Sequence, residues 1–118
     1  MTTRDMRDEL LIDLINRTEM EGNGPRITVV AEGVVITGRI AAHRHWATHI
    51  ADRLGDAGQP DERFTEDFAR EATEPLAYPP TFLHLQGCQL ISGNSSLPTA
   101  LGEFFRVPLS AVSAWSVR

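Results

Sequence analysis

The chain has 118 residues, the size of one domain, and its 42% apolar and 23% charged residues are typical of a folded globular protein. Its formal net charge is −5 and all 11 basic residues are arginine, which excludes a Schiff-base lysine and a phosphate-loop lysine. The arginines form no basic cluster, so nucleic acid is not an expected partner.

The N-terminal residues are polar and charged, without the apolar run of a signal peptide. No stretch approaches the roughly 20 apolar residues that cross a bilayer, so no membrane partner is expected. The single cysteine, Cys88, excludes a disulfide within the chain and fits a reducing compartment. We therefore expect a cytoplasmic protein.

The first predicted element is an amphipathic helix over residues 5–20. Its charged side chains occupy one face, and its apolar face contains Met6, Leu10, Leu11, Leu14 and Ile15. The glycines and the proline of residues 21–25 end it.

Residues 26–42 predict a β-hairpin, because β-branched and polar side chains alternate on both sides of a short central break. Glu32 and Gly33 occupy the position of a tight turn. Gly38, inside the second strand, predicts a bend or a bulge there.

Residues 43–72 change to helical spacing and predict an insertion of two short helices. Trp46 belongs to the apolar stripe of the first helix, and Phe64 and Phe68 lie one turn apart on the inner side of the second. The prolines of residues 73–80 indicate a connection.

The remaining part of the chain, residues 81–118, predicts three strands. They cover residues 81–91, 103–109 and 113–117, with a polar loop over residues 92–102. Pro108 favours an edge position or a strand end.

These elements predict an α+β protein with a single domain over residues 1–118. We expect a small, strongly bent, five-stranded antiparallel sheet or partly open barrel, with a helical insertion between strands two and three. The order of elements resembles the Sm-like small barrel, a likeness of fold that says little about function.

Three histidines form the one candidate metal group. His43 and His45 share a face if they lie on a strand, whereas His45 and His49 share a face on a helix, and Asp52 lies nearby. Both pairs are well oriented only if the strand meets the helix near His45. We therefore expect a polar junction with no metal and no other cofactor.

His84 and Cys88 lie four residues apart on a predicted strand and therefore share a face. A rise of roughly 3.3 Å per residue separates them by about 13 Å, which is too far for a nucleophile and its base. We expect Cys88 to be a small core residue and His84 to have a structural or interface role.

Three residues are interface candidates: Arg106, Phe104 and Trp115. Arg106 lies between apolar strand residues, so its side chain must reach water or a carboxylate. Trp115 lies close to the C-terminus, where an exposed aromatic side chain suits a partner surface. Core packing is nevertheless the favoured role of Trp115, as it is of Trp46, Phe64 and Phe68.

Three segments, in the same order, resemble the gas vesicle protein U family (GvpU-like accessory proteins). Residues 27–40 resemble its first hairpin, and Phe82 to Cys88 (Phe-Leu-His-Leu-Gln-Gly-Cys) resembles its Phe-Ile-His-Leu-Lys strand. Residues 102–112 resemble its closing segment of Gly-x-x-aromatic-Arg. One difference is Val107, where the family usually has glycine after the arginine.

The resemblance implies a non-enzymatic, cytoplasmic accessory protein that acts in the assembly or clustering of gas vesicles. Its implied partners are the vesicle shell or other accessory proteins, and the exposed strand edges suggest a homo-oligomer. No catalytic residues come with this family. Two alternatives are an Sm-like RNA-binding or other small-barrel interaction module, and a small metal-dependent hydrolase that uses His43, His45 and His49.

Overall fold

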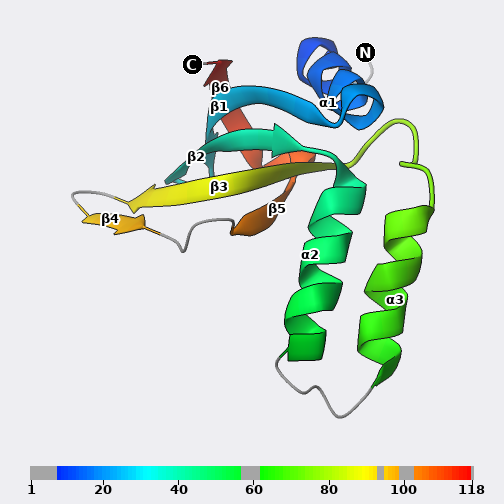
Figure 1. Cartoon of the computed structure of the whole chain (residues 1–118). Coiled ribbons are helices and arrows are strands. Elements are labelled where there is room, and N and C mark those ends of the chain that lie inside the picture. Colours follow the sequence, from blue (N-terminus) through cyan, green and yellow to red (C-terminus); the bar gives the residue numbers. More distant parts are fainter. Residues whose placement is uncertain (1–7, 57–61, 93–94, 99–102, 118) are drawn as a thin grey trace.

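A computed structural model describes residues 8–56, 62–92, 95–98 and 103–117 of the chain, in which three helices accompany one six-stranded antiparallel sheet (Figure 1). In chain order the elements are α1 (Glu9–Glu21), β1 (Asn23–Ala31), β2 (Val34–Ala41), α2 (His43–Asp56), α3 (Glu62–Thr73), β3 (Phe82–Ser92), β4 (Ser95–Pro98), β5 (Phe104–Pro108), a short 3-10 turn (Leu109–Ala111) and β6 (Val112–Val117). The predicted α+β class, the N-terminal helix and the helical insertion between β2 and β3 are confirmed.

The strands follow the order β4-β3-β2-β1-β6, and β5 also pairs with β3. The first half of β3 pairs with β5 and its second half pairs with β4, while β2 lies along its other edge. Since β5 and β6 do not pair within the described residues, the sheet stays open and is no closed barrel. No helix of the described part is long and apolar enough to cross a membrane.

The sixth strand, β4, corrects the prediction of a polar loop over residues 92–102. Its residues 95–98 pair with residues 89–92 of β3, in register from Ser92↔Ser95 to Gln89↔Pro98. Because β3 continues beyond its pairing with β5, its main-chain N–H and C=O groups there need other partners. Main-chain pairing supplies them without any alternation of apolar side chains.

The predicted turn between β1 and β2 is confirmed. Ala31 pairs with Val34, so the loop contains only Glu32 and Gly33, and both residues have positive φ angles, of 51° and 83°. Two consecutive positive φ angles define the type I′ turn, whose twist matches that of the two strands. The turn sets the register of the hairpin.

The irregularity predicted at Gly38 is present, but the extra residue belongs to the neighbouring strand. Thr37 pairs with Gln89 and Arg39 with Gln86, so the β2–β3 register shifts by one residue opposite Gly38. Gly87 takes up this shift with a φ angle of 62°, a conformation that favours glycine. Side chains beyond Gly87 therefore point to the opposite face from the one that alternation predicts.

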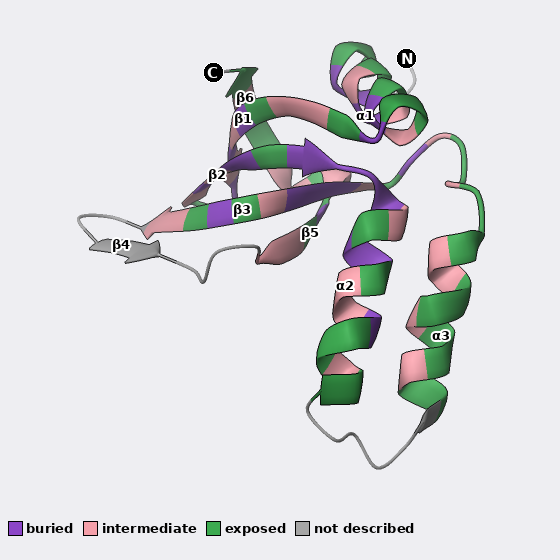
Figure 2. Cartoon of the chain, in the orientation of Figure 1, coloured by how far each residue is buried: buried purple, intermediate pink, exposed green. Residues whose placement is uncertain are grey.

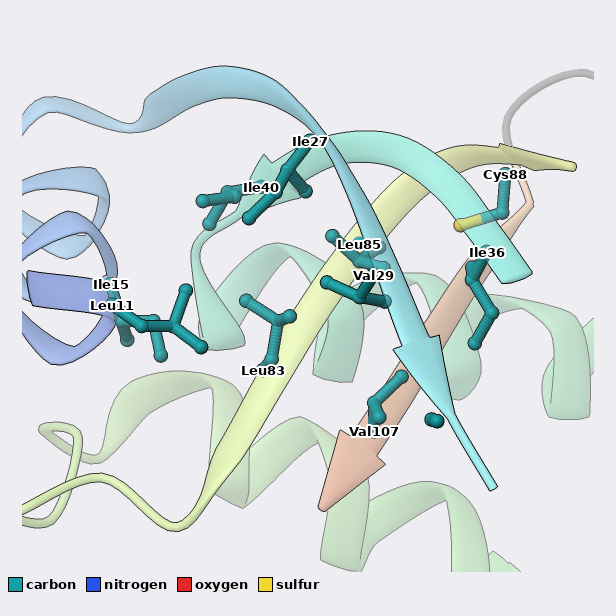
Figure 3. Packing of buried hydrophobic residues seen from close by; sticks show 11 residues of the cluster. Leu11, Ile15, Ile27, Val29, Ile36, Ile40, Leu83, Leu85, Cys88 and Val107 are labelled. Carbon is teal, nitrogen blue, oxygen red and sulfur yellow. The ribbon is translucent and has the colours of Figure 1, made fainter. Parts of the chain in front are cut away.

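Apolar side chains of α1 and the sheet form the core (Figure 3). Asp8 caps α1, because its Oδ1 accepts hydrogen bonds from the main-chain N–H groups of Leu10 and Leu11. The buried face of α1 differs from the predicted one, since Ile12 is buried and Leu10 is 70% exposed. The core cluster contains Leu11, Ile15, Ile27, Val29, Ala31, Ile36, Ile40, Leu83, Leu85, Cys88 and Val107.

Helices α2 and α3 pack side by side as a hairpin that projects away from the sheet (Figure 1). Burial is concentrated in the half of α2 nearest the sheet, and the far half is mostly exposed (Figure 2). The ring of Phe68 meets Trp46 edge-on at 5.5 Å, as expected for an inner position. Phe64 is 52% exposed, so its predicted inner position is wrong: it belongs to the far part of the hairpin, beyond the reach of the sheet.

Replacement of Gly38 by alanine should destabilise the fold. A Cβ atom at position 38 would lie 3.0 Å from the carbonyl oxygen of Gln86 and 3.1 Å from Sγ of Cys88, so the main chain of β3 would have to move. We expect a loss of about 1–3 kcal/mol in the free energy of unfolding, measured by urea denaturation. Gly55→Ala in α2 is the control, because a Cβ atom there has no neighbour within 4 Å. Equal effects of both substitutions would contradict the packing at Gly38.

Candidate functional site

A group of side chains around one arginine, the Arg106 cluster, lies where α2 meets the sheet. It consists of Arg106 from β5, Phe82 and His84 from β3, and Trp46 from α2. Arg106 is the cross-strand partner of His84, so the two side chains share a face of the sheet. Phe82 precedes His84 by two residues and lies on the same face. Trp46 comes from the first turns of α2 and is only 8% exposed.

The guanidinium group of Arg106 is held by two aromatic rings and one hydrogen bond. Its Cζ atom lies 4.3 Å from the ring centroid of Trp46 and 4.0 Å from that of Phe82. A cation at this distance from a ring face is attracted to it electrostatically. The Nε–H group donates a hydrogen bond of 3.1 Å to Nε2 of His84. These contacts fix the plane of the guanidinium group.

His84 acts as a neutral acceptor in this cluster. Its side chain is 2% exposed, and its ring lies 5.0 Å from that of Trp46. Burial is the main cause that lowers the pKa of His84 to about 3, and electrostatic interactions with Arg106 and His43 lower it further. A neutral ring that accepts at Nε2 carries its proton at Nδ1. His84 therefore orients Arg106 without adding a charge.

Partial burial of its guanidinium group also lowers the pKa of Arg106, while the carboxylate of Glu71 on α3 acts in the opposite direction. No ion pair within 4 Å joins Arg106 to a carboxylate among the described residues. Among these residues, its guanidinium group contacts the ring faces of Trp46 and Phe82 and the Nε2 lone pair of His84. The terminal amino groups of its guanidinium have no hydrogen-bond acceptor among the described residues, and Arg106 as a whole is exposed.

A second polar group, the His43 latch, joins α1 to the start of α2 and to the segment that follows α3. Nδ1 of His43 lies 2.7 Å from Oε1 of Glu19, and Nε2 lies 2.9 Å from the main-chain carbonyl oxygen of Glu74. The main-chain N–H of His43 donates to Oε2 of Glu19, and Nη1 of Arg44 donates to the main-chain oxygen of the same residue. His43 is 3% exposed, so the latch is internal.

The three histidines of the candidate metal group do not converge. His43 is buried in the latch, and His45 is exposed. His49 is half-buried, with its ring 4.7 Å from the ring of Phe104 and its Nε2 3.8 Å from Glu103. Within the ranges that the structure describes, no three His, Cys, Asp or Glu side chains are placed to hold a metal ion.

The expectation that His84 and Cys88 share a face is wrong. Cys88 belongs to the apolar core together with Leu85, whereas His84 contacts the ring of Trp46 on the other face. The cause is the extra residue at Gly87, which reverses the alternation of side chains between them. Cys88 is 4% exposed, as expected of a core residue, and burial is the main cause that raises the pKa of its thiol to about 11.

Trp115 and Phe104, the other interface candidates, are both half-buried. The indole N–H of Trp115 donates a hydrogen bond of 2.6 Å to Oδ2 of Asp8, and this bond is the main cause that lowers the pKa of the Asp8 carboxyl. Trp115 also lines a groove of about 600 Å³ between α1, β6 and residues 79–81. Phe104 packs on the ring of His49. The interface roles of Trp115 and Phe104 stay predictions.

The contact of Arg106 with Trp46 was missed in the sequence. The two residues are 60 positions apart and belong to elements of different period, so no local pattern connects them. A weaker signal was present: His84 interrupts an apolar strand and has apolar neighbours on both sides. A polar side chain at such a position needs a buried partner.

The stability of the fold should depend on pH through His84. Because its pKa in the folded chain lies below the ordinary 6.5, its contribution is complete above pH 6.5 and is lost as the pH falls toward 3. We expect this group to lower the free energy of unfolding by about 1 kcal/mol per pH unit in that range. His84→Gln keeps an acceptor without this titration. Urea denaturation at several pH values should give a flatter profile for the variant, and parallel profiles would contradict the assignment.

Removal of the Glu19 carboxylate should open the His43 latch. Glu19→Ala leaves a buried main-chain N–H and a buried ring nitrogen of His43 without their acceptor, so we expect a loss of about 1–3 kcal/mol in the free energy of unfolding. Glu21→Ala, an exposed carboxylate on the same helix, is the control and should change stability by less than about 0.5 kcal/mol. The measurement is chemical denaturation at neutral pH. A Glu19→Ala variant as stable as the control would show that the latch does not contribute to the free energy of unfolding.

Comparison with known proteins agrees with the resemblance of the three strand segments. Neither the curated proteins nor the solved structures gave a match. The sequence model of one family, described as gas vesicle protein GvpU-like, matches residues 8–118, which include every helix and strand of the fold. The chain therefore belongs to the GvpU-like family of gas vesicle proteins.

Proposed function

We propose that this chain is a non-enzymatic accessory protein that acts by binding other proteins in the assembly or clustering of gas vesicles. Family membership over residues 8–118 is the observation that carries this proposal. The proposed partners are the vesicle shell or other accessory proteins, and the proposed location is on the vesicles in the cytoplasm. Further copies of the chain are proposed as an additional partner.

The free edge of β6 supports binding between proteins. Among the described strands, β6 pairs only with β1, so its other edge has main-chain groups that can accept a further strand. Residues 112–117 contain no charged side chain and no proline, the two features with which many proteins protect an edge. Val117 is 46% exposed at the end of this strand. A second copy or a partner strand can therefore extend the sheet here.

The roles of the buried polar groups support a structural protein. His84 accepts a hydrogen bond from Arg106, and both ring nitrogens of His43 contact oxygen atoms of α1 and of the segment after α3. These groups hold the helical hairpin on the sheet. The thiol of Cys88 packs in the core, where burial disfavours the reactive thiolate.

The proposal predicts that the purified protein associates with purified gas vesicles. In a flotation assay the protein should rise with the vesicles, and light microscopy should show more vesicle clusters than without it. Protein without vesicles, and an unrelated acidic protein of similar size with vesicles, are the controls. If the folded protein stays in the lower fraction and leaves vesicle clustering unchanged, the proposed function is wrong.

A further inference from the structure

We propose that Arg106 is a preformed recognition site for a single carboxylate group, which a partner protein presents among apolar residues. This inference rests on the proposed function, because it names the chemical group by which a gas vesicle protein would be held.

The first support is the fixed orientation of the guanidinium group. Two aromatic rings cover it, and its Nε–H group is used by His84. The two terminal amino groups, with four N–H donors in one plane, have no acceptor among the described residues, and Arg106 is exposed. A donor group that is held in place before binding loses little rotational freedom when an acceptor arrives.

The second support is the contrast with other arginines of the chain. Nη1 of Arg53 lies 3.3 Å from Glu103, and Nη2 of Arg70 lies 2.6 Å from Asp67, so a carboxylate of the chain already occupies each of them. Arg106 lacks such a partner within 4 Å among the described residues. The carboxylate of Glu71 acts on it from a greater distance and does not occupy the donors.

A carboxylate fits these donors better than other groups. Its two oxygen atoms match the planar fork of arginine in a bidentate pair, which is among the strong hydrogen-bonded contacts of proteins. The chain has a net charge of −5, and residues 43–74 contain eight acidic side chains against four arginines. A strongly acidic or phosphate-rich partner would be repelled. A single carboxylate with apolar neighbours avoids that repulsion, and those neighbours can contact the half-buried ring of Phe82.

The direct test uses a small probe and does not depend on vesicles. ¹⁵N-labelled protein is titrated with sodium butyrate and, in parallel, with butyramide, which has the same shape but no charge. In the wild type, the Nε–Hε resonance of Arg106 should shift in a saturable manner with butyrate only. The Arg106→Lys variant lacks this resonance, and its remaining resonances should show no saturable shift. Arg17→Gln, an exposed arginine on α1, is the control and should respond as the wild type does. Equal shifts with butyrate and butyramide would overturn the proposal.

The second test uses vesicles whose accessible carboxylates have been converted to amides with a carbodiimide and ethanolamine. Wild-type protein should bind them about tenfold to a hundredfold more weakly than untreated vesicles, the loss expected for one charge-assisted pair. Arg106→Gln and Arg106→Lys should bind untreated vesicles with a similar loss, after circular dichroism has shown that both fold. Wild-type affinity in either variant, or for amidated vesicles, would overturn the carboxylate site while the accessory function stands. Absence of binding by the wild type would contradict the function instead, and the butyrate titration would still decide the site.

Discussion

The first half of strand β3 is covered on both of its faces, by the apolar core on one side and by helix α2 on the other. Leu83 and Leu85 are fully buried in the core, and His84 between them is 2% exposed against the ring of Trp46. A polar side chain at such a site is costly unless it has a hydrogen-bond partner. The neutral ring of His84 finds this partner in Arg106, so the burial of β3 determines both the protonation state of the histidine and the position of the arginine.

Polar and aromatic contacts near its base attach the helical hairpin to the rest of the fold. The His43 latch connects the start of α2 to α1 and to the segment after α3, and the Arg106 cluster connects α2 to β3 and β5. In a low-dielectric interior such contacts are strong when every group is satisfied and costly when one is lost. The same contacts that hold the hairpin also fix the guanidinium group of Arg106, whose terminal amino groups have no acceptor among the described residues.

Local chemistry predicted much of the fold, and long-range pairing defined the rest. The turn at Glu32 and Gly33 and the helical spacing of residues 43–72 depend on neighbouring residues, and both were predicted. Strand β4 was missed because main-chain pairing with the end of β3 forms it without apolar alternation. Gly87 was read as an ordinary strand residue, and its reversal of the alternation separates Cys88 from His84.

The candidate site was predictable only in part. Arg106 was identified because an arginine between apolar strand residues needs a special environment. The nature of that environment depends on the register of β5 against β3 and on where α2 crosses the sheet, and neither is encoded in a local pattern. The three histidines form a candidate group in the sequence because they lie close together along the chain. In the structure, the helix over residues 43–56 directs His43 and His45 to different sides, so they do not share a site.

The claim that Arg106 is a fixed donor group can be measured directly by ¹⁵N relaxation of its Nε–Hε bond in the free protein. A guanidinium group held by Trp46, Phe82 and His84 should have an order parameter close to that of rigid main chain, about 0.85. A value below about 0.6, typical of a flexible group, would show that the side chain moves freely and would contradict the account of the cluster.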